Sequence, residues 1–239
     1  GGPDELRGLF GSMPYYAGLG DLHREWNELD VAGEHLNVAL ALAQSMVTLD
    51  AEYVTQGYLS LARLQHARGE PAQAQATLAA GTDLAHRRGF VPHLITRSAA
   101  VQAQLALAAG RLPAAVAWSE ASGLGPDDPL AFAREAEYLI LARVWIAQAR
   151  AGASGDHLAR ALRLLDRLMA DAAPKARQAR VVEVLILQAL ARAAQGNGPE
   201  ALAALGQALR LAAPEGYERL FVDEGRPLVA GLGQQVEAV

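Results

Sequence analysis

Six histidines are the side chains of this 239-residue chain best suited to binding a metal ion or carrying a proton. No two of them are four residues apart, and the sequence contains no H-E-x-x-H motif, so a metal site would need distant segments to converge. The chain has no cysteine, which excludes disulfides, thiolate zinc sites, iron–sulfur clusters and cysteine nucleophiles. We therefore expect no metal and no cofactor in this chain. The histidines are His23, His35, His66, His86, His93 and His157.

Other catalytic arrangements are also missing from the sequence. No serine lies in a G-x-S-x-G turn. Glu135 and Glu137 are two residues apart and fall on different faces of a helix, so we interpret them as solvated side chains, not as an acid/base pair. Lys175, the single lysine, lies in Pro-Lys-Ala, outside any glycine-rich phosphate loop. The sequence predicts a protein that is not an enzyme and binds no nucleotide.

The elements that hold these side chains are predicted to be helices. Alanine and leucine occupy 51 and 37 positions, and both favour helix strongly. No apolar run is long enough to span a membrane, and no basic segment followed by an apolar one opens the chain. We expect a cytoplasmic protein without membrane contact. Because the chain starts at Gly1 without a methionine, we also expect it to be a piece of a longer protein.

The charge of the chain is unevenly distributed. The formal net charge is −5, and the first 53 residues alone carry −7. Arg160, Arg163 and Arg167 share one helical stripe but alternate with aspartates, so we interpret the stripe as a solvated face. A nucleic-acid-binding surface would concentrate basic residues. We therefore expect no direct contact between this chain and nucleic acid.

A repeat of about 42 residues organises the sequence. In Gly69-Glu70-Pro71 the glycine is predicted to end one helix and the proline to open the next. Comparable junctions recur at Asn27, Gly110, Gly152 and Gly196. The pattern predicts an all-α, right-handed superhelix of about five tetratricopeptide-like helical hairpins. The period exceeds the roughly 34 residues of a standard tetratricopeptide repeat, and HEAT-type repeats are the structural alternative.

Small residues recur where the helices of each hairpin should cross, which would let their backbones approach closely. The first helices of the first and fourth units are expected near Pro14–Trp26 and Leu130–Ala151. Trp145 and Tyr138, seven residues apart, are predicted to be core, and Leu220 with Phe221 to cap the last hairpin. The small residues are Gly20, Ala62, Ala103 and Ala189 before the junctions, and Ala32, Ala74, Ala115 and Ala201 after them.

Three segments carry a family resemblance: the hairpin over residues 18–36, the segment over 182–191 and the closing segment over 214–229, whose sequence is PEGYERLFVDEGRPLV. They resemble the MalT-like, large ATP-binding group of LuxR-type transcriptional regulators. The resemblance implies a lead-in over residues 1–12, a repeat domain over 13–213 and a closing cap over 214–239. It also implies that an ATPase and a DNA-binding domain lie outside this piece.

The resemblance further implies an effector-sensing and protein-interaction domain of a transcriptional regulator. Its partners would be a small-molecule inducer or a regulatory protein, the ATPase and DNA-binding domains of the full-length chain, and, through self-association, a second copy. The alternative is a free-standing tetratricopeptide-like scaffold that docks peptides or proteins. An all-helical enzyme is a third hypothesis, for which the sequence supplies no motif.

The first helix of each hairpin is expected to line the concave surface of the superhelix. Aligning the units on their junctions places seven polar residues on or near that surface. Its arginines suit a polar or anionic effector, or an acidic surface on a partner, because guanidinium offers a planar set of donors. The alternative is that they are ordinary solvated side chains. The seven are Arg24, Glu25, Arg63, His66, Arg97, Gln104 and Glu183.

Overall fold

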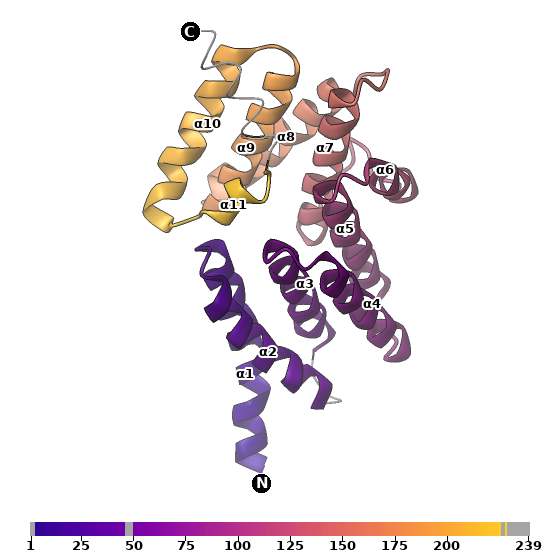
Figure 1. Ribbon diagram of the computed structural model, residues 1–239, viewed down its shortest axis with the longest axis vertical. Helices are drawn as coiled ribbons and strands as arrows, with labels where there is room; N and C mark the ends of the chain where they lie inside the picture. The colour runs from indigo at the N-terminus through magenta and orange to yellow at the C-terminus, as the bar shows by residue number, and fades with distance from the viewer. Residues whose placement is uncertain (1–2, 46–49, 226–227, 229–239) are drawn as a thin grey trace. The chain divides into compact units, whose positions relative to one another are not determined.

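The computed structural model describes residues 3–45, 50–225 and 228, and all the regular elements in this part of the chain are helices, as predicted (Figure 1). It divides into two compact units, Gly1–Leu105 and Ala106–Val239. The first contains α1 (Pro3–Glu25), α2 (Leu29–Ser45), α3 (Ala51–Ala67), α4 (Pro71–Arg87) and most of α5 (Pro92–Ala108). The second contains α6 (Leu112–Ala121), α7 (Glu135–Arg150), α8 (His157–Ala172), α9 (Gln178–Ala194), α10 (Gly198–Ala212) and α11 (Arg219–Val222).

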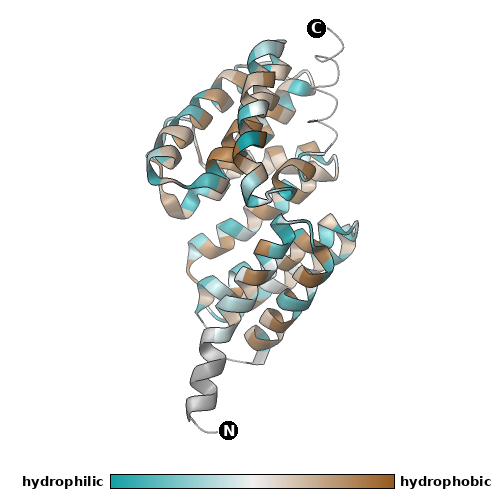
Figure 2. Ribbon diagram, turned by 90° about the vertical axis from the view of Figure 1, so that its left-hand side faces the viewer, coloured by the Kyte–Doolittle hydropathy of each residue, from teal (hydrophilic) through white to brown (hydrophobic). Residues whose placement is uncertain are grey.

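Consecutive helices pack as antiparallel pairs within each unit. In the first unit α1 packs on α2 and α3 on α4, while α3 also contacts α1 and α2. In the second unit α7 packs on α8 and α9 on α10, and α9 also contacts α7 and α8. Hydrophobic and hydrophilic residues alternate along these helices (Figure 2). This is the hairpin arrangement that the repeat predicts; the right-handed superhelical path of the whole array stays a prediction.

The predicted junctions share one turn geometry. Gly69 follows α3 with a φ of 78°, and the next backbone N–H, that of Glu70, donates to the Gln65 carbonyl. A left-handed residue followed by such a bond is the Schellman ending of a helix. Asn27 adopts the same conformation with a φ of 61°, and Glu28 N–H donates to the His23 carbonyl. Asparagine tolerates this region better than other non-glycine residues, which explains the junction without glycine.

The small residues lie at close helix contacts, as predicted. A side chain at Gly20 would bring its Cβ within 2.4 Å of Leu36 Cγ, so α1 and α2 approach each other closely there. The alanines predicted at the crossings are all buried: Ala32, Ala62, Ala74, Ala103, Ala115, Ala189 and Ala201. Close backbone approach therefore replaces large side chains in much of this packing.

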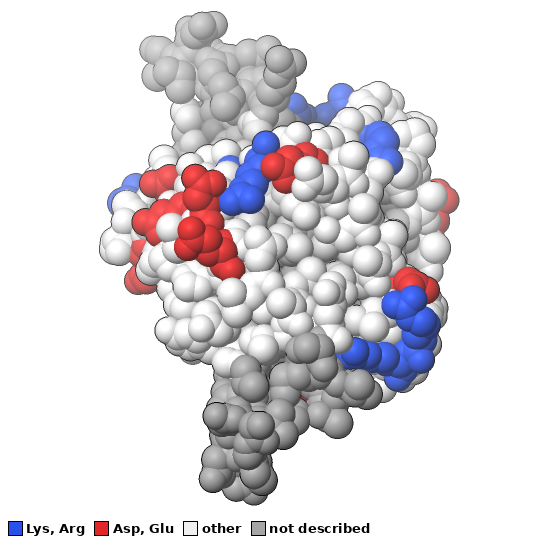
Figure 3. Space-filling view, turned by 60° about the horizontal axis from the view of Figure 1, so that its bottom comes forward, with Lys and Arg blue, Asp and Glu red and all other residues white. Residues whose placement is uncertain are grey.

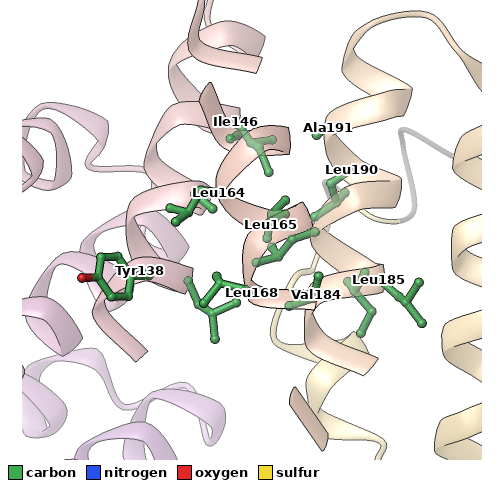
Figure 4. Packing of buried hydrophobic residues seen from close by; sticks show 14 of the residues in the cluster. Tyr138, Ile146, Leu164, Leu165, Leu168, Val184, Leu185, Leu190 and Ala191 are labelled. Atoms are coloured by element: carbon green, nitrogen blue, oxygen red, sulfur yellow. The ribbon is translucent and has the colours of Figure 1, made fainter. Parts of the chain in front are cut away.

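The largest hydrophobic cluster lies in the second unit, where α8 packs between α7 and α9 (Figure 4). Leu164 and Leu165 are fully buried, and Leu168 is 2% exposed. Tyr138 and Trp145 belong to this cluster, so their assignment to the core is confirmed. Leu220 and Phe221 pack against it from the closing segment, and their role as a cap of the array stays a prediction.

Two first helices differ from their expected ranges. The helix α1 begins at Pro3, so Pro14 lies inside it and the expected start at Pro14 is wrong. The helix α7 begins at Glu135, after a 3-10 turn over Phe132–Arg134, and not near Leu130. A residue of α8 holds the loop before α7 in place, because the Arg167 guanidinium donates to the carbonyls of Pro126 (2.5 Å) and Asp128 (2.6 Å).

That contact also corrects the interpretation of the α8 arginines as a purely solvated stripe. Arg167 holds a loop, and the Arg160 guanidinium lies 4.3 Å from the centre of the Trp145 ring, a cation–π distance. Arg163 alone among the three is exposed.

The predicted end segments extend beyond the described residues. Of the lead-in over 1–12, residues 3–12 continue α1, and residues 1–2 lie outside the description. Of the cap over 214–239, residues 226–227 and 229–239 lie outside it. Across the described ranges, none of the helices is both long enough and apolar enough to cross a membrane.

Candidate functional site

A chain of polar side chains links the first helices of the first unit. We call Asp21, Glu52, Gln56 and Arg97 the unit 1 ladder. Gln56 of α3 donates from Nε2 to Asp21 Oδ2 of α1 at 2.7 Å and to Ser60 Oγ at 3.0 Å. Arg97 of α5 donates to Gln56 Oε1 and to Glu52 Oε1. The ladder therefore ties α1, α3 and α5 together through side-chain hydrogen bonds.

The ladder includes only one of the residues predicted in this unit. Arg97 is in it, half-buried, with its guanidinium bonded to Glu52 and Gln56. Arg24 is 6% exposed, and its Nη1 donates to Glu25 Oε1 at 2.6 Å, so this predicted pair is in contact, with Arg24 buried and the Glu25 side chain 27% exposed.

Three further predicted residues of this unit lie outside the unit 1 ladder. Arg63 and His66 are half-buried along α3. Gln104 is half-buried on α5, and its Oε1 is shielded from solvent without a hydrogen-bond partner among the described residues.

The second unit holds a more deeply buried network. We call Glu135, Arg143, Arg180, Glu183 and Glu224 the unit 2 network. Arg143 of α7 donates to Glu183 of α9 at 2.8 Å from Nη2. The same guanidinium donates to Glu224, which follows α11, at 2.8 Å from Nε. These three side chains are only 11–12% exposed, so one cation binds two nearly buried carboxylates from distant segments.

The network extends along α9 toward the start of α7. Arg180 donates to Glu183 and, from Nε at 2.9 Å, to Glu135. Arg177 also pairs with Glu135. Glu135 and Glu137 are 7% and 2% exposed, and Glu137 pairs with Arg134. Their interpretation as solvated residues is therefore wrong, because arginines from α9 and from the turn before α7 cover them.

The two carboxylates on Arg143 have opposite pKa shifts. Burial alone would raise the pKa of Glu183, but the charges of Arg180 and Arg143 outweigh it and lower this pKa to about 2. Burial raises the pKa of Glu224, and its single cation, Arg143, does not compensate fully. Burial would lower the pKa of Arg143, but Glu224 and Glu183 raise it above its usual value. The ionised form of Glu183 is therefore stabilised more strongly than that of Glu224.

The cations of both polar arrangements are already engaged by side chains of the chain itself, which limits their chemistry. The guanidinium groups of Arg97, Arg143 and Arg180 already bind carboxylate or amide oxygens. Within the described residues, no three histidine, aspartate or glutamate side chains gather as metal ligands would. An anionic ligand on these faces would therefore compete with glutamates of the chain itself, and the arrangement suits exchange of ion pairs, not proton transfer.

The charged surface has no broad basic area on the face seen in Figure 3. Groups of arginine and lysine alternate there with groups of aspartate and glutamate, and uncharged residues lie between them.

Comparison with known families decides which repeat this is. The MalT-like TPR region, where TPR denotes the tetratricopeptide repeat, matches residues 2–237. The chain belongs to the MalT-like TPR family. HEAT-type repeats are thereby set aside as the structural alternative. A search of curated proteins finds no match.

The units of this chain share a repeat position that the sequence analysis applied to Arg97 and Glu183 but not to Gln56. Gln56, Arg97 and Glu183 each lie thirteen residues before the glycine that ends their hairpin turn. All three belong to the unit 1 ladder or the unit 2 network. Comparing this position across units would have added Gln56 to the predicted site. Arg143, Arg180 and Glu224 follow no such register and were missed.

Proposed function

We propose that this chain is the effector-sensing and protein-interaction region of a LuxR-type transcriptional regulator of the MalT-like group. In this proposal an inducer or a regulatory protein binds the faces of the first helices. It binds with different affinity in the resting and active states, and so biases ATPase and DNA-binding domains outside this chain. The chain itself carries out no reaction, makes no direct contact with nucleic acid and works in the cytoplasm.

The observation that carries this proposal is the position of Glu224. Glu224 lies in the closing segment, beyond the last hairpin, and its carboxylate binds Arg143 on α7. Arg143 also binds Glu183 on α9. A ligand that moves α9 relative to α7 changes the contacts of the closing segment, which supports the transmission of a binding signal along the chain.

Ligand binding can be tested with the purified protein and a set of small carboxylates and phosphorylated metabolites. Thermal shift identifies candidates, and titration calorimetry measures their affinity. Arg97→Gln should weaken a ligand of the unit 1 ladder at least about tenfold, the usual value of a lost charged hydrogen bond. Arg87→Gln is the matched control, because Arg87 is exposed on α4 and pairs with Asp83.

The outcomes separate sensing from scaffolding. Binding that Arg97→Gln weakens and Arg87→Gln leaves unchanged supports the proposal. If the chain binds peptides or proteins, but no metabolite and no regulatory protein, the result favours the free-standing scaffold instead. Equal effects of both substitutions would place the ligand away from the first helices and contradict the proposal.

A further inference from the structure

The first helix exposes a row of large side chains on one face. Tyr15 is 62%, Leu22 38% and Trp26 37% exposed. They are spaced seven and four residues apart, so Tyr15 and Leu22 share one stripe of α1, and Trp26 continues it in the turn directly after the helix. We call this stripe the α1 face.

The same positions are covered in the next hairpin. Counted from the junction residues Asn27 and Gly69, Tyr15 corresponds to Gly57 and Leu22 to Leu64. Gly57 is buried, and a Cβ there would lie 3.2 Å from Met13 of α1. Leu64 is fully buried against Ala32 and Leu36 of α2. Leu22 and Leu64 occupy the same repeat position but differ in exposure, because a preceding hairpin covers only Leu64.

The second unit gives an independent instance. Counted from Gly196, the corresponding residues of α9 are Val184 and Ala191, and both are fully buried. There α8, from the preceding hairpin, packs on α9. In both units, the hairpin that covers this face therefore comes from the preceding repeat.

The sequence of α1 also resembles that of the covered helix. Tyr16, Leu19 and Leu22 repeat at the same spacing as Tyr58, Leu61 and Leu64 of α3. In α3 all three are at most 7% exposed, and they pack on alanines and a leucine of α2. The helix α1 thus carries the residue types of a covered helix, extended by the aromatic rings of Tyr15 and Trp26.

We propose that the α1 face is the docking surface for a further helical hairpin of the same protein, one that precedes α1 and stacks on it as α1–α2 stacks on α3. Its second helix presents alanine and leucine to Leu22, as α2 does to Leu64. Near the turn it contacts Trp26, whose counterpart Arg68 donates from Nη2 to the Leu29 carbonyl of the preceding hairpin at 2.8 Å.

Hydroxyl-radical footprinting of the full-length protein tests this directly. Tyr15 is compared with two tyrosines of the same unit, Tyr53 at 45% and Tyr58 at 6% exposure. Oxidation of Tyr15 and Trp26 is expected to be slow, near the rate of Tyr58. Oxidation at the rate of Tyr53 would overturn the proposal. Protection that disappears on dilution would also overturn it, because a second copy would then be the occupant.

A substitution gives a second measurement. In the full-length protein, Leu22→Ser is expected to lower the midpoint of thermal unfolding by about 4 °C or more, as for a buried leucine. The control Val91→Ser, at a residue 50% exposed, is expected to leave the midpoint unchanged. Equal midpoints for the two variants would contradict a covered α1 face.

Discussion

Glu183 is expected to be the most important single carboxylate for the stability of the second unit. It accepts hydrogen bonds from Arg143 and Arg180, and its pKa falls from 4.5 to about 2 on folding. That difference corresponds to about 3 kcal/mol of folding free energy at neutral pH. Glu183→Gln should therefore lower the free energy of unfolding by about 3 kcal/mol, because the nearly buried guanidinium of Arg143 and the partly buried one of Arg180 lose part of their compensation.

The pH dependence has a defined sign. Because the pKa of Glu183 is lower in the folded chain, its stabilisation is fully present above pH 4.5 and is lost as the pH falls toward about 2. The wild-type chain should lose stability across this window, and Glu183→Gln should lose about 3 kcal/mol less across it.

Urea unfolding suits this measurement because urea, unlike guanidinium, does not screen ion pairs. The fluorescence of Trp145, which is 3% exposed, reports on the second unit. Glu200→Gln is the matched control: Glu200 pairs with Arg192 but is 53% exposed, and such pairs contribute at most about 1 kcal/mol. The reasoning from burial is refuted if Glu183→Gln lowers the free energy of unfolding no more than Glu200→Gln does. It is also refuted if Glu183→Gln leaves the loss of stability at acid pH unchanged.

Three further predictions concern other contacts. In the same urea assay at pH 7, Glu224→Gln should lower the free energy of unfolding clearly less than Glu183→Gln does. Burial raises the pKa of Glu224, and a neutral amide resembles its protonated form. Equal losses for the two variants would contradict this. Leu165→Ala should destabilise the second unit by about 2–5 kcal/mol, and a cost under about 1 kcal/mol would show that the site collapses to fill the cavity. Gly20→Ala should cost about 1–3 kcal/mol by calorimetry, since its Cβ would meet Leu36, and unchanged stability would show that α1 and α2 can separate freely.

The fold was predictable because its determinants are local. Glycine at the turns, proline at the second helix and alanine at the crossings recur with the repeat, and the Gly69 turn and the buried Ala62 follow directly from them. The start of α7 was not predictable in this way. The loop before it is held by Arg167, some forty residues later in the chain, through bonds to backbone carbonyls that leave no periodic signal.

The site was predictable only in part, for a related reason. Arg97 and Glu183 were found because they occupy one position of the repeat. Glu135 was assigned to solvent because its partners, Arg177 and Arg180, lie one hairpin further along the chain. Whether a charged residue on a first helix is solvated or paired depends on the facing helix. The sequence of its own helix does not contain that information.

The pairing of Arg143 with Glu224 has a consequence for the order of folding. Most contacts in a repeat array join neighbouring hairpins, whereas this pair joins residues 81 positions apart. Contacts so distant in sequence require a large loop to close first and form late. The closing segment should therefore dock after α7 and α9 have paired, and it should be the first part of the second unit to detach when the unit begins to unfold.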